Sequence, residues 1–77
     1  MSVKITDVVC NPNGECVFHF TVCDDQHREA LLATLTLEEA HGIAKGKNSG
    51  DVFSMCRAII EAADHRTLIG RTFGEAS

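Results

Sequence analysis

The sequence contains no tryptophan and no tyrosine, and its only aromatic residues are four phenylalanines. A surface that stacks bases or sugar rings needs several exposed aromatic side chains, so the chain has little material for one. Basic residues are also few, with seven Lys and Arg against eleven Asp and Glu and a formal net charge of −4. This charge opposes the attraction to phosphate groups that nucleic-acid binding requires. We expect no nucleic-acid partner, because such a surface would need a cluster built from the scattered basic residues Lys45, Lys47, Arg66 and Arg71.

Long hydrophobic runs are missing as well. No segment approaches the ~18 apolar residues of a membrane-spanning helix, and the first residues lack the apolar stretch of a secretory signal. We therefore expect a cytoplasmic protein without membrane contact. Thiols stay reduced in the cytoplasm. The four cysteines are accordingly expected to be reduced thiols that pack as small hydrophobic side chains, namely Cys10, Cys16, Cys23 and Cys56.

The chain has a single proline, no low-complexity segment and no visible linker, and 44% of its 77 residues are hydrophobic. This composition is typical of a folded protein, and the length allows one domain covering residues 1–77. A domain of this size buries only about 60–65% of the surface that its unfolded chain exposes. Self-association would be a natural source of additional stability.

Two strands are predicted in the first third of the chain. Residues 3–9 are rich in β-branched side chains, with one irregularity in their alternation, and residues 15–23 alternate regularly. Between them, Asn11-Pro12-Asn13-Gly14 is the clearest turn signal in the sequence. The alternation places Phe18 and Phe20 on one face of the second strand, which we expect to point at the core.

Residues 27–35 can be read in two ways. They can continue as a third strand antiparallel to the second, or they can form a helix, because residues 28–33 are strong helix formers. The strand is favoured because Thr34 and Thr36 are β-branched, and because Thr36 and Glu39 have the spacing of a capping box that starts a new helix. The sequence alone leaves both possibilities open.

Two helices are predicted in the second half, from Leu37 to about Lys45 and from residue 52 to about residue 67. Asp51 is the expected N-cap of the second helix, and Gly70 is placed to end it. The second helix has an apolar stripe at helical spacing, formed by Val52, Met55, Cys56, Ile59, Ile60 and Ala63. The expected fold is therefore α+β, a three-stranded antiparallel β-meander followed by two α-helices packed on one face.

Several features of residues 15–69 resemble a small bacterial family of uncharacterised domains in which strands are followed by two helices. They are the segment Phe20-Thr21-Val22 leading into a turn at Asp24-Asp25, the short capped helix, and the segment Asp51-Val52-Phe53 with Arg57, Ile60 and Glu61 on the last helix. The resemblance implies a bacterial protein with this order of elements. It implies no activity and no functional residue.

Soft metal ligands are concentrated within fourteen residues, at Cys10, Cys16, His19 and Cys23. No Cys-x-x-Cys motif is present, and on an extended strand Cys16 faces opposite to His19 and Cys23. Three of these ligands would converge only if a bulge interrupted the strand. They are candidate metal ligands, but we expect no cofactor, and no arrangement of side chains in the sequence identifies a catalytic residue.

The face of the sheet away from the helices remains to be covered. Five residues are candidates for an interface through the sheet. Val17, His19 and Thr21 lie on this face, and Leu31 and Leu32 lie on opposite faces of the third strand, both of which are apolar. A small domain rarely leaves such a surface in water. The leading hypothesis is a non-enzymatic interaction or accessory module that homodimerises or binds a protein partner through its sheet. The alternative is a small metal- or thiol-dependent protein that uses Cys10, Cys16, Cys23 and a histidine.

Overall fold

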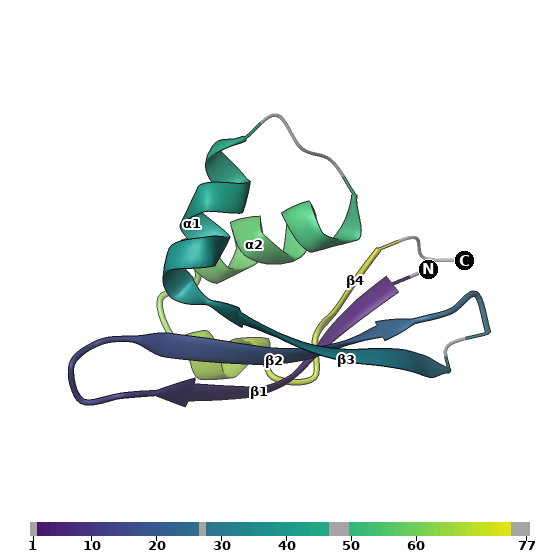
Figure 1. Ribbon diagram of the computed structural model, residues 1–77, viewed down its shortest axis with the longest axis horizontal. Coiled ribbons are helices and arrows are strands. Elements are labelled where there is room, and N and C mark those ends of the chain that lie inside the picture. Colours follow the sequence, from purple (N-terminus) through teal and green to yellow (C-terminus); the bar gives the residue numbers. More distant parts are fainter. Residues whose placement is uncertain (1, 27, 47–49, 75–77) are drawn as a thin grey trace.

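The computed structural model describes residues 2–26, 28–46 and 50–74. Its elements follow one another as β1 (Ser2–Cys10), β2 (Cys16–Cys23), β3 (Glu29–Thr36), α1 (Leu37–Lys45), α2 (Asp51–Glu61), the 3-10 helix η1 (His65–Leu68) and β4 (Thr72–Gly74). The strands form one antiparallel sheet, and α1 and α2 lie together on one side of it (Figure 1). The predicted α+β class and the order of three strands followed by two helices are confirmed.

The sheet has four strands in the order β3-β2-β1-β4, one more than predicted. The extra strand, β4, pairs with the start of β1, so that Phe73 lies opposite Val3. No strand was predicted after the second helix. A strand of three residues has too short a pattern to be recognised in a sequence, and β4 exists because the chain returns to β1 after η1.

Residues 29–36 form a strand, so the helical alternative for this segment is wrong; residue 27 lies outside the described residues. Their intrinsic preference for helix is overridden by pairing with β2, which runs from Val17 opposite Thr36 to Cys23 opposite Glu29. One bulge at Ala30 shifts the register near the start of the strand. The regular part of β3 is therefore residues 31–36.

A second bulge interrupts β1, where the irregular alternation was predicted. Ile5 lies opposite Phe20 and Asp7 lies opposite His19, so Thr6 is the additional residue. The Thr6 hydroxyl donates a hydrogen bond to the His19 carbonyl at 3.2 Å. Because the side-chain period of a strand is two, the extra residue moves every later side chain of β1 to the other face.

Helix α1 begins with the predicted capping box. The Thr36 hydroxyl accepts a hydrogen bond from the Glu39 backbone N–H, and the Thr36 N–H donates to the Glu39 carboxylate, both at 3.1 Å. The two bonds satisfy two backbone N–H groups, of Thr36 and Glu39, that the start of a helix otherwise leaves unpaired. They fix the point at which the chain changes from strand to helix.

Helix α2 ends at Glu61, about six residues earlier than predicted, and Asp51 is its first residue rather than its N-cap. The N-cap is Gly50, whose positive φ of 107° suits glycine. After α2 the Asp64 carboxylate accepts a hydrogen bond from the Arg66 N–H at 3.0 Å and starts η1. This break turns the chain so that Leu68 is buried and the backbone can return to β1.

The core lies between the sheet and the helices. Phe18 is fully buried, and Phe20 is 7% exposed, which confirms that this face of β2 points inward. The other large aliphatic side chains that are fully buried come from β1, α2 and η1: Val3, Ile5, Met55, Ile59 and Leu68. The predicted stripe of α2 is confirmed at Met55, Cys56 and Ile59, whereas Val52 and Ile60 are exposed.

We predict that Thr36→Ala lowers the free energy of unfolding by about 1 kcal/mol, because it removes the side-chain half of the capping box. Thr34→Ala is the matched control, since Thr34 is an exposed threonine of the same strand. Urea denaturation followed by circular dichroism measures both. Equal losses in the two variants would contradict the assigned role of the cap.

Candidate functional site

The turn between β1 and β2 places two of the predicted candidate ligands opposite each other. The Asn11 N–H donates to the Glu15 carbonyl at 2.7 Å, and the Gly14 N–H donates to the Asn11 carbonyl at 3.0 Å. Gly14 has a φ of 92°, which explains why glycine occupies this position of the turn. The hairpin closed in this way sets Cys10 directly across from Cys16.

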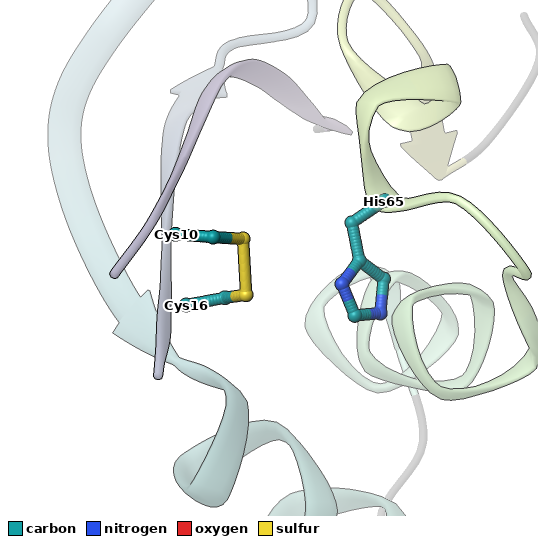
Figure 2. Close-up of side chains that lie close together, drawn as sticks. All are labelled: Cys10, Cys16 and His65. Carbon is teal, nitrogen blue, oxygen red and sulfur yellow. A yellow bond between two sulfur atoms is a disulfide. The ribbon is translucent and has the colours of Figure 1, made fainter. Parts of the chain in front are cut away.

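Cys10 and Cys16 form a disulfide (Figure 2). The prediction of four reduced thiols is therefore wrong for these two residues, while Cys23 and Cys56 are free and buried. The sequence did contain a signal for the pair. Two cysteines flanked the strongest turn at positions that a hairpin register can bring together, but their pairing depends on the bulge at Thr6.

His65 is the third member of this cluster and was not among the four candidate metal ligands. Figure 2 shows its imidazole beside the two sulfur atoms, and the ligand atoms of Cys10, Cys16 and His65 all lie within 4.8 Å of one another. The ring packs edge-to-face on Phe18, with 5.2 Å between ring centroids. His65 falls within the helix that was predicted to run to about residue 67, and only the break before η1 turns it toward the disulfide.

The remaining two candidate ligands lie elsewhere. His19 is half-buried in the middle of β2, opposite Asp7 and Thr34. Cys23 is at the far end of the same strand, where its thiol lies 3.9 Å from the Thr21 hydroxyl. The structure thus places a histidine from η1 close to Cys10 and Cys16, whereas His19 and Cys23 lie away from them.

A cavity of about 420 Å³ adjoins the disulfide on the side of β2 and α1. Cys16 is part of its lining, together with Glu15, Glu38 and His41. Cys16 itself is buried, whereas Cys10 is exposed at the end of β1. Cys10 is therefore the more exposed residue of the disulfide, and Cys16 is the one that lines the cavity.

The five candidate interface residues differ in their access to solvent. Val17 and His19 are half-buried, and Thr21 is only 1% exposed, between Lys4 on β1 and Leu32 on β3. Leu31 and Leu32 are 60% and 77% exposed, the two highest fractions among the large hydrophobic residues that the structure describes. The exposed part of the predicted surface is thus concentrated on β3.

Strand β3 is an edge of the sheet. It pairs with β2 on one side, and no strand of the described residues pairs with its other side. The sequence of β3 is EALLATLT, in which Glu29 is the one charged residue. Natural edge strands are commonly protected by lysine, proline or a bulge, because their unpaired N–H and C=O groups attract other strands. Here the bulge at Ala30 lies near the start of β3, and residues 31–36 have no such protection.

None of the helices in the described ranges is long and apolar enough to cross a membrane. Comparisons with protein-family models, curated proteins and solved structures found no match. The resemblance to an uncharacterised bacterial family stays a prediction.

We predict that reduction of the Cys10–Cys16 disulfide lowers the free energy of unfolding by about 2 kcal/mol. The estimate is the loop-closure entropy of a cross-link between cysteines six residues apart. Urea denaturation with and without a phosphine reductant measures it. Cys10→Ser is the control, because the reductant has no disulfide to open in that variant. A wild-type stability that does not change on reduction would refute the estimate.

Burial raises the pKa of the Cys56 thiol above its ordinary value of 9.0. We predict that iodoacetamide modifies Cys56 much more slowly in the folded protein than in urea, as measured by peptide mass spectrometry, because the thiolate is the reactive form.

The same burial makes stability depend on pH. As the pH rises, the Cys56 thiol loses its proton at a lower pH in the unfolded chain than in the folded protein. Cys56 therefore makes the free energy of unfolding fall above about pH 9, a contribution that Cys56→Ala removes. Equal alkylation rates of Cys56 in the folded and the unfolded protein would disprove the effect of burial on this thiol.

Proposed function

We propose that this chain is a small non-enzymatic interaction module that forms a homodimer by pairing its β3 edge with the β3 edge of a second copy. The observation that carries the proposal is the unprotected edge at residues 31–36, which has exposed leucines on both faces. Pairing would join two four-stranded sheets into one continuous antiparallel sheet. Each copy would then satisfy the backbone groups that the edge of the other leaves unpaired.

The positions of Leu31 and Leu32 support this arrangement. Leu31 lies opposite Val22 and is on the helix side of the sheet, whereas Leu32 lies opposite Thr21 and is on the open side. A partner that covered only the open face would leave Leu31 in water. A strand added beside β3 would place side chains next to both leucines, because neighbouring strands contact each other on both faces.

A second copy is the proposed partner because edge-to-edge antiparallel pairing is compatible with two-fold symmetry, in which the same surface is used twice. The small size of the domain supports self-association as well, since 77 residues bury a limited core. We keep the cytoplasm as the proposed location. In that compartment a protein disulfide is usually transient or regulatory, so the Cys10–Cys16 bond would open and close there.

Leu32→Lys is the test of the proposal. Two lysines brought close together at the dimer interface repel each other, and the loss of an exposed apolar contact weakens it further. We expect the dimer Kd to rise roughly five- to thirtyfold, corresponding to about 1–2 kcal/mol. Sedimentation equilibrium over a range of protein concentrations measures Kd, and native mass spectrometry gives the number of subunits.

Val9→Lys is the matched control. Val9 is 47% exposed and lies opposite Val17, on the same open face as Leu32 but on β1. Its substitution adds the same charge away from the β3 edge and should leave Kd unchanged. A wild-type protein that stays monomeric at the highest concentration would overturn the proposal. Equal weakening by both variants would place the interface on the open face instead of the edge.

A further inference from the structure

We propose that the Cys10–Cys16 disulfide and His65 are the closed form of a redox-controlled zinc site. In the reduced chain, the thiolates of Cys10 and Cys16 and the imidazole of His65 would bind one Zn²⁺, and oxidation to the disulfide would release it. The proposal rests on the convergence of three soft or borderline ligands from β1, β2 and η1. It is independent of the proposed dimer.

The geometry of the cluster fits this ion. Tetrahedral zinc has Zn–S distances of about 2.3 Å and Zn–N distances of about 2.0–2.1 Å, which separate its ligand atoms by about 3.5–3.8 Å. The ligand atoms of Cys10, Cys16 and His65 lie within 4.8 Å of one another. Small side-chain movements after the sulfur–sulfur bond opens would give the required spacing.

The three ligands are held in place by contacts other than the disulfide. Cys10 and Cys16 are fixed opposite each other by the hairpin register, and His65 is fixed by the Asp64 cap of η1 and by its contact with Phe18. Reduction removes the covalent bond but none of these contacts. The ligands would therefore stay close together in the reduced chain, which lowers the entropic cost of binding a metal ion.

The redox step is an ordinary thiol–disulfide exchange. Two molecules of a monothiol such as glutathione supply two electrons and two protons, so that the protein disulfide becomes two thiols and the monothiols become one disulfide. Zn²⁺ then replaces the two thiol protons, which are released to water. Cys10 is the exposed residue of the pair, and we assign it as the side from which the thiolate attacks.

The fourth position of the zinc would be open to water or to a small ligand. Three protein ligands with one exchangeable position are the usual set of a reactive zinc site, and two cysteines with one histidine are a known version of it. The cavity of about 420 Å³ has Cys16 in its lining, and a small ligand would approach the zinc from this side. The zinc occupancy of such a site would depend on both the redox state of the thiols and the concentration of available zinc.

Cobalt titration of the intact chain tests the proposal. The protein is reduced with a phosphine, and Co²⁺ is added as a spectroscopic substitute for Zn²⁺. We expect one Co²⁺ per chain, an ultraviolet band from cobalt–thiolate bonds and the intense visible bands of tetrahedral cobalt, all of which disappear when Zn²⁺ is added. The oxidised chain should show none of these bands, and this comparison requires no substitution.

Paired variants identify the ligands. Removal of a second-shell partner of a metal ligand already weakens binding about 10- to 100-fold, so loss of a ligand in His65→Asn or Cys10→Ser should weaken Co²⁺ binding by more than about a hundredfold. His19→Asn and Cys23→Ser are the matched controls, since these residues lie away from the cluster and should leave binding unchanged. His65→Cys supplies a different ligand at the same position and should restore tight binding, which a merely misfolded variant would not do.

Three results would overturn the proposal. They are a reduced wild-type chain without a cobalt–thiolate band, a band of equal strength in the oxidised chain, and Co²⁺ binding as tight in His65→Asn as in His19→Asn. In each case the disulfide would be a structural cross-link only.

Discussion

The register between β1 and β2 is the constraint on which the rest of the structure depends. The bulge at Thr6 sets it, because without the extra residue Cys10 would lie opposite Glu15 and Val9 opposite Cys16. With the bulge, Val8 joins the side of Phe18, and the two cysteines meet at the end of the hairpin. The hydrogen bond from Thr6 to the backbone of β2 holds the shifted strand in place.

The second constraint is the break between α2 and η1. A continuous helix would carry residues 62–67 away from the sheet, whereas the Asp64 cap redirects the chain toward β1. The redirected segment buries Leu68, turns His65 toward the disulfide and returns the backbone to the sheet edge as β4. The Gly70 N–H donates to the Ile5 carbonyl at 2.7 Å, which fastens this segment beside the bulge in β1.

The two proposed activities use different parts of the molecule. The cysteine and histidine cluster is formed by the β1–β2 hairpin and η1, whereas the proposed dimer edge is β3. Both depend on β2, which pairs with β1 on one side and with β3 on the other. A small sheet can in this way present a cross-linked end and a pairing edge with little structure besides its core.

The sequence by itself determined the features that depend on neighbouring residues: the turn at residues 11–14, the inward face at Phe18 and Phe20, the capping box at Thr36, and the order of the first three strands and the two α-helices. Tertiary structure decided what depends on distant contacts. Pairing with β2 made residues 29–36 a strand despite their helical preference, and the break after α2 created β4 and brought His65 to Cys10 and Cys16. The reason is physical, since local propensities amount to about 1 kcal/mol per residue or less, and a completed sheet or a buried side chain outweighs them.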